Sequence, residues 1–175
     1  MTLEAAARGE GRHDLERLVR AAQHGDQLAM SDLMDLLAPH VARWCGPIAL
    51  QNGPDAAQES MIAIFRGLAG LREPAALIGW ARAIAIREAV RIAKRERSRA
   101  ADPLDELPAP NDPLLAVEIR ETLARLSPEH RAVLVLRNLE GLDERTASRL
   151  LAVAPGTVKS RLARARARFR KEWLR

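Results

Sequence analysis

The chain has 175 residues, a formal net charge of +5, 47% hydrophobic residues and 29% charged residues, a mixture typical of globular rather than disordered proteins. It contains no tyrosine and only 3% aromatic residues, and its abundant alanine, leucine and arginine favour helices over strands. Its one cysteine, Cys45, excludes an intramolecular disulfide and a cysteine-based zinc site. The composition therefore nearly excludes an all-β fold, and the helical patterns along the chain predict an all-α fold.

Apolar residues at helical spacing predict two helices before residue 50. The first carries Leu15, Leu18, Val19 and Ala22, with Asp14 as its expected cap and Gly25 as its expected stop. The second is expected from Leu28 through Trp44, with a break or kink near Pro39.

Two more helices are predicted between residues 52 and 99. The turn signal Asn52-Gly53-Pro54 precedes a helix that ends near Gly70. Pro74, suited to a first helical turn, opens a long helix that continues into a basic stretch. From Arg82 to Arg99 this stretch has seven basic residues and two acids, a net charge of +5.

A linker is predicted from Ala100 to Pro113, where four prolines stand within fourteen residues. This segment has four acids and no base. We therefore expect two small helical domains, at residues 1–99 and 114–175, joined by residues 100–113.

The C-terminal residues predict a helix-turn-helix, in which the second of two short helices enters the DNA major groove. Ser127-Pro128 starts a helix that stops at Gly141, Asp143 caps the next, and Pro155 opens the last. We expect Ser148 to be the small residue where the two helices meet. From Pro155 to Arg175 the net charge is +7, which favours binding to a polyanion.

The string Gly156-Thr157-Val158-Lys159-Ser160-Arg161-Leu162-Ala163-Arg164-Ala165-Arg166, with the preceding Leu123–Leu134 and Glu140-Gly141-Leu142, resembles region 4 of bacterial sigma factors, in particular the extracytoplasmic-function (ECF) class. The resemblance implies that this half reads the −35 promoter element. The residues expected to contact that DNA are Arg145, Thr157, Lys159, Ser160, Arg161 and Arg164. The turn between the helices is usually glycine in this family, and here it is Ala152.

The N-terminal half is similar to region 2 of the same family, so the resemblance covers about Leu15 to Trp173. Asp55-Ala56-Ala57-Gln58-Glu59 resembles the helix that family members dock on the RNA polymerase clamp. The expected polymerase contacts are Asp55, Gln58, Glu59 and Ile62, which share one helical face.

The stretch Gly79–Ala85 and the basic residues after it look like the part of region 2 that holds the separated −10 strand. The residues expected there are Arg82, Arg87, Arg91, Lys94 and Arg95. Trp80 is expected to be a core residue rather than a base-stacking platform.

No motif supports an enzyme, a cofactor or a metal. The four histidines are scattered, without a pair at metal-ligand spacing, and no glycine-rich phosphate loop occurs. Cys45 beside Trp44 is expected to be a packed apolar thiol. Neither a signal peptide nor a membrane span is indicated, so a cytoplasmic location is expected.

The sequence thus favours a sigma factor that binds core RNA polymerase and promoter DNA. An anti-sigma factor is a further partner that the family resemblance implies. The alternative is a stand-alone helix-turn-helix regulator or a degenerate sigma-like protein that acts through protein contacts.

Overall fold

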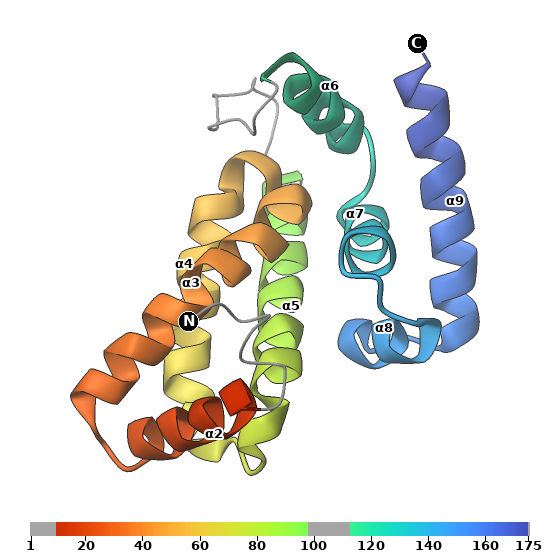
Figure 1. The fold of residues 1–175 in the computed structure, drawn as a ribbon. Helices are drawn as coiled ribbons and strands as arrows, with labels where there is room; N and C mark the ends of the chain where they lie inside the picture. The colour runs from red at the N-terminus through yellow and green to blue at the C-terminus, as the bar shows by residue number, and fades with distance from the viewer. Residues whose placement is uncertain (1–9, 98–112, 175) are drawn as a thin grey trace.

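The computed structural model describes residues 10–97 and 113–174, and both ranges are built from helices (Figure 1). The N-terminal half contains α2 (Glu10–Gln23), α3 (Gln27–Ala49), η1 (Leu50–Asn52), α4 (Gly53–Gly67), η2 (Leu68–Gly70), η3 (Pro74–Ala76) and α5 (Leu77–Arg97). The C-terminal half contains α6 (Pro113–Ala124), α7 (Pro128–Leu134), the π-helical turn η4 (Val135–Leu139), α8 (Glu144–Leu151) and α9 (Pro155–Trp173). No strand occurs in these two ranges, which confirms the all-α prediction.

The N-terminal half is a bundle in which α3, α4 and α5 pack on one another and α2 covers one end of α3. Trp44 of α3, Ile64 of α4 and Leu77 of α5 are almost fully buried in its core. A Cβ atom on Gly53 would lie 3.0 Å from the Cα of Gly46. Glycine at position 53 therefore lets the start of α4 lie against the backbone of α3.

Two predicted boundaries in this half are wrong. Helix α2 begins at Glu10, so Asp14 lies inside it and forms an ion pair with Arg17 at 2.5 Å instead of capping the helix. Helix α3 runs through Pro39, so the predicted break is absent, and the alternative of a kink stays a prediction. Leu37 and Val41, on either side of this proline, are fully buried, and their packing holds the helix together against the loss of one backbone hydrogen bond.

The caps predicted in the C-terminal half are confirmed. The Ser127 side chain accepts a hydrogen bond from the His130 amide, and the Asp143 side chain accepts one from the Thr146 amide at 2.8 Å. Gly141, where the helix was expected to stop, has a φ of 63°. Each cap satisfies a backbone donor that the first turn of a helix leaves without a partner.

The two halves pack against each other: α7 contacts α3 and α5, and α8 contacts α5 (Figure 1). Buried Arg131 of α7 crosses this boundary, where its Nε donates to the Ile48 carbonyl oxygen of α3 at 2.7 Å. The predicted linker lies outside the described residues except for Pro113, the first residue of α6. The division into two domains stays a prediction.

Candidate nucleic-acid interface

Helices α8 and α9 form the predicted helix-turn-helix. The Ser148 Oγ donates to the Val153 carbonyl oxygen at 2.5 Å, and the Val153 amide donates to the Ser148 carbonyl oxygen at 3.1 Å. Ala147 of α8 and Val158 of α9 are fully buried between the helices. Ser148 is thus the small contact residue that the sequence predicted, and it also fixes the turn.

The turn places a non-glycine residue in a left-handed conformation. Ala152 has φ 52° and ψ 45°, and its amide donates to the Arg149 carbonyl oxygen at 3.3 Å. The left-handed region costs an L-residue with a Cβ atom about 1–2 kcal/mol. The substitution of glycine by alanine here is therefore a local source of strain.

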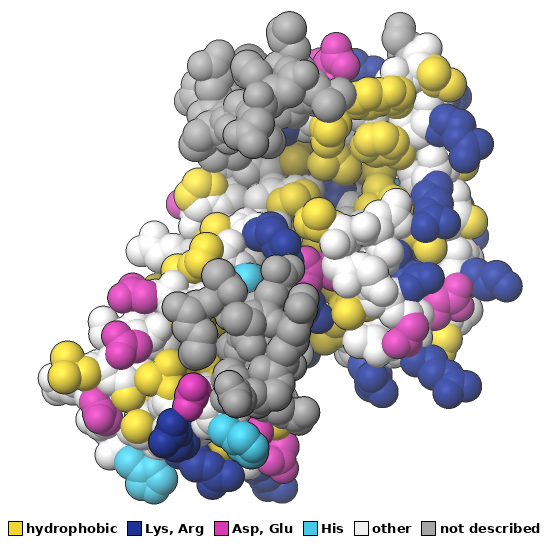
Figure 2. Space-filling model, viewed as in Figure 1, with side chains coloured by type: hydrophobic (Ala, Val, Ile, Leu, Met, Phe, Trp, Pro, Cys, Tyr) yellow, Lys and Arg dark blue, Asp and Glu magenta, His cyan; other side chains and the backbone are white. Residues whose placement is uncertain are grey.

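Three of the six predicted −35 residues are exposed on α8 and α9. Arg145, Lys159 and Arg164 are exposed, whereas Thr157, Ser160 and Arg161 are half-buried. The Ser160 Oγ donates to the Thr157 carbonyl oxygen at 3.1 Å, so it is engaged within its own helix. Figure 2 shows Lys and Arg side chains along the outer side of α9.

The structure adds Arg149 and Arg168 to this basic surface, and both are exposed. Arg168 lies one helical turn after Arg164, a spacing that was readable in the sequence. The Arg149 Nη2 donates to the Thr146 Oγ1 at 3.1 Å, which holds its guanidinium beside the start of α8.

The predicted −10 residues of α5 separate into two groups. Arg87, Arg91 and Arg95 are exposed and recur every four residues, so they form one row along the helix. Arg91 pairs with Glu88 at 2.6 Å and Arg95 approaches Glu96 at 3.8 Å. Arg82 and Lys94 instead contact acids of the C-terminal half, Glu140 at 3.2 Å and Glu129 at 2.6 Å.

Arg82 is the least accessible of the predicted DNA contacts, since 17% of its side chain is exposed. Its guanidinium carbon lies 5.2 Å from the centre of the Trp44 ring, within cation–π distance. Burial lowers the pKa of Arg82, and the charge of Glu140 opposes that shift. The sequence pattern could not reveal this arrangement, because Glu140 belongs to the other half of the chain.

The predicted polymerase residues share one face of α4. Asp55, Gln58 and Glu59 are exposed and Ile62 is half-buried, while Ala56, Ser60 and Ile64 on the opposite face are buried. Phe65, which sequence reasoning missed, is 53% exposed on the same face, three residues after Ile62. The face therefore combines two acids with an apolar end.

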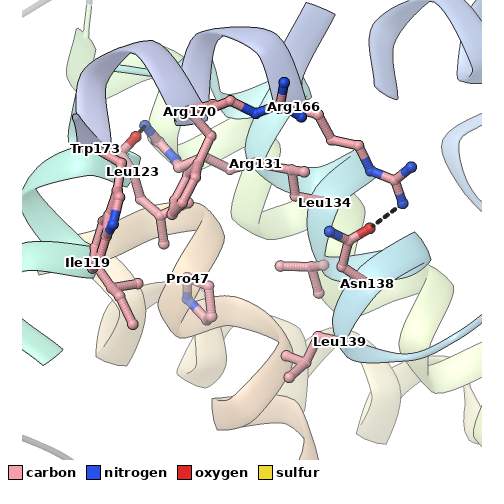
Figure 3. A pocket seen from close by; sticks show the side chains of 12 residues that line it. Pro47, Ile119, Leu123, Arg131, Leu134, Asn138, Leu139, Arg166, Arg170 and Trp173 are labelled. Atoms are coloured by element: carbon pink, nitrogen blue, oxygen red, sulfur yellow. Dashed lines mark hydrogen bonds between the residues drawn. The ribbon is translucent and has the colours of Figure 1, made fainter. Parts of the chain in front are cut away.

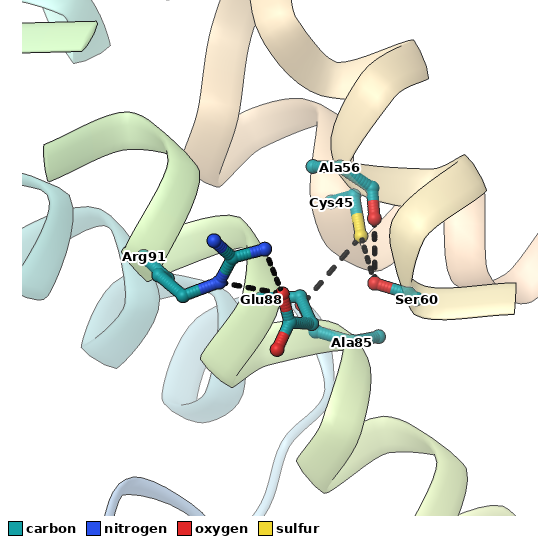
Figure 4. Close-up of polar contacts among 6 residues, drawn as sticks. All are labelled: Cys45, Ala56, Ser60, Ala85, Glu88 and Arg91. Atoms are coloured by element: carbon teal, nitrogen blue, oxygen red, sulfur yellow. Dashed lines mark hydrogen bonds and ion pairs between the residues drawn. The ribbon is translucent and has the colours of Figure 1, made fainter. Parts of the chain in front are cut away.

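Cys45 is a structural thiol. It is fully buried, and its sulfur lies 3.6 Å from the Ser60 Oγ and 3.6 Å from the Ala85 carbonyl oxygen (Figure 4). Burial raises the pKa of Cys45 to about 11, so the thiol stays protonated near neutral pH and is a poor nucleophile. This environment agrees with the packed thiol that the sequence predicts.

An apolar hollow of about 620 Å³ lies between α6, η4 and α9 (Figure 3). Ile119, Leu123 and Leu139 line it together with Phe169 and Trp173, whose rings stack with their centres 5.8 Å apart. Arg166 and Arg170 stand at its edge, and Arg166 donates to the Asn138 Oδ1 at 2.8 Å. In Figure 2 this hollow belongs to a hydrophobic patch beside α9.

Within residues 10–97 and 113–174, no cluster of histidine, cysteine and acidic side chains could hold a metal ion. None of the helices in the same ranges is long and apolar enough to cross a membrane.

Comparison with known proteins finds similarity to one family model and to several curated proteins, and all of these are sigma factors. Residues 116–169 match the model of the family described as sigma-70, region 4. The chain is 31% identical over 172 residues to the ECF RNA polymerase sigma factor SigM of Mycobacterium tuberculosis strain Erdman, covering 91% of this chain and 85% of that protein. It is 28% identical to the ECF RNA polymerase sigma-E factor of Escherichia coli K12, covering 85% of this chain and 88% of that protein.

Two solved structures share the fold at 20% sequence identity. CnrH, solved in complex with the cytosolic domain of CnrY, has a TM-score of 0.64 and covers 90% of this chain and 95% of its own. The sigma factor RpoE of Bartonella quintana, solved in complex with the anti-sigma factor NepR, has a TM-score of 0.67 and covers 82% of this chain and 95% of its own.

A helix-turn-helix with a basic outer surface, attached to a second helical bundle, defines a DNA-binding transcription factor of the sigma-70 class. The identity and coverage shared with SigM go further: the chain belongs to the family of ECF RNA polymerase sigma factors. It is thus a sigma factor that directs transcription initiation.

Proposed function

We propose that the chain divides the work of initiation among three surfaces: α4 binds core RNA polymerase, α5 holds the −10 element, and α8 with α9 reads the −35 element. The observation that carries this proposal is the separation of charge. The exposed acids Asp55 and Glu59 lie on α4, whereas the exposed arginine and lysine rows lie on α5 and α9.

At the −35 element, α9 enters the major groove with its N-terminal half. Exposed Lys159 neutralises a phosphate, and Arg164 is placed to reach a phosphate or a guanine edge. Arg145 and Arg149 of α8 lie on the neighbouring side of the helix-turn-helix and contact the DNA backbone. These two arginines therefore orient the helix-turn-helix on the DNA and contribute little to the recognition of a particular base sequence.

At the −10 element, the row formed by Arg87, Arg91 and Arg95 follows the phosphates of the separated strand. The free energy for strand opening comes from binding the unpaired strand. No nucleotide hydrolysis by this chain is required, and we assign it no enzymatic activity.

On the polymerase, the α4 face pairs Asp55 and Glu59 with basic side chains of the clamp. Ile62 and exposed Phe65 extend this contact with apolar surface. Exposed apolar side chains beside acids are a typical composition for a docking face, because burial of the former adds affinity and the latter select a basic partner.

We place this activity in the cytoplasm, where polymerase and chromosome are found. The Bartonella RpoE was solved in complex with the anti-sigma factor NepR, and we extend such a partner to this chain. The hollow lined by Leu123, Phe169 and Trp173 offers an apolar seat for an anti-sigma factor.

The test combines size-exclusion chromatography with transcription in vitro. The purified chain should co-elute with core polymerase and start transcripts from a subset of genomic promoters. The variant Asp55→Arg/Glu59→Arg should bind core polymerase at least about tenfold more weakly and therefore no longer co-elute with it, because it reverses the charge that faces the basic partner. The matched variant Asp32→Arg/Asp35→Arg, with two exposed acids of α3 reversed, should bind normally. DNA binding without any polymerase binding would leave a stand-alone regulator as the function.

A further inference from the structure

The hollow between α6, η4 and α9 leaves large apolar side chains exposed in one place. Leu139 is 51% exposed, Trp173 is 38% exposed and Ile119 is 37% exposed, and all three line the same space of about 620 Å³. Small-molecule pockets have volumes of about 300–1,000 Å³. Single exposed apolar residues are ordinary on a protein surface, but a group of them around one concave space marks a binding site.

The walls of the hollow are apolar. Phe169 and Trp173 of α9 form a flat wall, because their rings stack with an interplanar angle of 12° and centres 5.8 Å apart. Pro47 and Leu139 lie across the hollow from α9, and Leu123 of α6 also lines it (Figure 3). Aliphatic side chains thus face an aromatic wall across a space that an aliphatic chain fills well.

The charged side chains that line the hollow are all basic. They are Arg131 of α7 together with Arg166 and Arg170, which project from α9 at its edge (Figure 3). No aspartate or glutamate is found among the described residues that line this space. The one acid of α9, Glu172, pairs with Arg125 at 3.2 Å. The hollow therefore has a positive potential that favours an anion.

Arg131 adds a buried charge to this potential. Its Nε donates to the Ile48 carbonyl oxygen at 2.7 Å and its Nη1 to the Leu126 carbonyl oxygen at 2.8 Å. Burial lowers the pKa of Arg131 to about 10, so the side chain is charged at neutral pH. Glu129, whose charge opposes this shift, pairs with Lys94 at 2.6 Å. Carbonyl oxygens satisfy the hydrogen bonds of Arg131 but leave its charge in place, so an anion nearby is stabilised.

An apolar space with arginines at one edge selects a ligand with two unlike ends. An aliphatic body gains affinity by covering the exposed surface of Ile119, Leu139 and Trp173. A carboxylate head fits the planar fork of a guanidinium group, which donates two parallel hydrogen bonds. A cationic head on the same body is repelled by three arginines.

We propose that the hollow binds a free single-chain carboxylate, such as a fatty acid, with its body along the stacked rings of Phe169 and Trp173 and its carboxylate at the arginines of α9. The proposed function seats an anti-sigma factor on the same side chains. Ligand and anti-sigma factor therefore exclude each other, and release from that partner responds to a small molecule. This consequence rests on the proposed function, whereas the binding site rests on the geometry of the hollow alone.

The first test measures binding of dodecanoate to the purified full chain by isothermal titration calorimetry, below the concentration at which dodecanoate forms micelles. The wild-type chain should bind one molecule. Decanoate should bind about 15-fold more weakly, because each buried methylene contributes a factor of about four. Dodecyltrimethylammonium has the same body with a cationic head and should bind at least about tenfold more weakly than dodecanoate. Equal binding of the two heads, or uptake of many molecules, would show nonspecific adsorption and overturn the proposal.

Charge-removing variants test the role of the arginines. Arg166→Gln/Arg170→Gln should bind dodecanoate at least about tenfold more weakly, because the charge-assisted hydrogen bonds to the head are lost. Arg20→Gln/Arg72→Gln, which alters two exposed arginines of the N-terminal half, has the same change in net charge and should bind as the wild type does. Circular dichroism checks that both variants are folded. Wild-type affinity in R166Q/R170Q, or equal losses in both variants, would overturn the proposal.

Tryptophan fluorescence locates the ligand without altering the arginines. Of the three tryptophans, Trp173 lines the hollow, whereas Trp44 is buried in the core. Dodecanoate should shift the emission to shorter wavelength in the wild type and in Trp80→Phe, but not in Trp173→Phe. A shift that persists in W173F would place the ligand elsewhere and overturn the site. Co-elution with core polymerase is scored separately: its absence would contradict the proposed function and leave the binding result in force.

Discussion

Single residues in this sigma factor owe their properties to what surrounds them. Burial keeps the thiol of Cys45 protonated, with a pKa of about 11, and burial also lowers the pKa of Arg82 although Glu140 lies beside it. Ala152 shows the reverse case, in which the fold imposes a backbone conformation that the residue disfavours. Local chemistry is thus set by position in the fold as much as by residue type.

The substitution Ala152→Gly should stabilise the protein. Glycine adopts φ 52° without the steric cost of a Cβ atom. Part of this gain is offset by the greater freedom of glycine in the unfolded chain, so a net gain of about 0.5–1 kcal/mol is expected. Urea denaturation measures it. Ala167→Gly, at an exposed position inside helix α9, is the control and should destabilise by about 1 kcal/mol, and a loss of stability in A152G would contradict the strain.

The N-cap Asp143 should give a pH-dependent contribution to stability. Hydrogen bonds from the Thr146 amide and hydroxyl hold the pKa of its carboxyl below the ordinary value. A lowered folded-state pKa means that the contribution is fully present above the unfolded-state pKa of about 3.9 and is lost as the pH falls through the folded-state value.

Thermal unfolding of Asp143→Ala and the wild-type chain tests this. The variant should melt at a lower temperature at pH 7, and the difference should shrink as the pH falls below about 4. A difference that stays constant to pH 3 would show that the carboxylate charge has no part in the cap.

At the scale of one element, α9 combines a buried stripe with a basic surface. Val158, Leu162 and Ala165 are buried at spacings of four and three residues, while Lys159 and Arg164 between them are exposed. The same periodicity therefore fixes both the packing of the helix and the direction of its charge. Arg161 is the exception, since it faces α5 across the interface.

Lys159→Ala/Arg164→Ala should weaken binding to a −35 duplex by about tenfold and reduce the slope of log K against log salt by about 2, since two phosphate contacts are lost. Fluorescence anisotropy at several salt concentrations gives both values. Arg20→Ala/Arg72→Ala changes two exposed arginines of the N-terminal half and should have little effect. If both double variants weaken binding equally, the effect is one of net charge and α9 is not the reading helix.

At the scale of the whole molecule, the buried apolar side chains of the described residues form one cluster that spans both halves. Trp44, Ile64 and Leu77 belong to its N-terminal part, and Leu126, Leu136 and Val158 belong to its C-terminal part. Helix α9 packs on α7 and α8. The larger contacts between the two halves join α3 to α7 and η4, and α5 to α7 and α8. Apolar packing as well as polar contacts therefore joins the two halves, and the division into two domains stays a prediction.

Cleavage at a protease site introduced near Pro108 should release two fragments that both remain helical, because each keeps apolar side chains packed among its own helices. Circular dichroism and thermal melting of the separated fragments measure this, with the uncut chain carrying the same site as the control. Loss of helical signal from either fragment would show that the halves fold only as one unit and would contradict the predicted domain division.

Sequence patterns predicted the helices, the caps at Ser127 and Asp143, and the exposed faces of α4 and α9, because these depend on spacing and on neighbours within a few residues. Asp14 was expected to cap the first helix, but that helix already includes the residues from Glu10 onward. Pro39 was expected to break the second helix, but the packing of its buried neighbours keeps the helix continuous. The spacing of Phe65 after Ile62 places it on the same face of α4. It was not predicted as a polymerase contact, because an apolar residue in a helix is usually assigned to the core.

The sequence by itself determined the class of fold, the helix-turn-helix and the family, since each resides in local periodicity and in a specific string of residues. Only the tertiary structure decided that Arg82 and Lys94 meet Glu140 and Glu129, and that Arg161 faces α5. The physical reason is separation along the chain: the paired residues are 35 or more positions apart and share no periodicity. Their burial between two packed halves is therefore invisible until those halves are placed together.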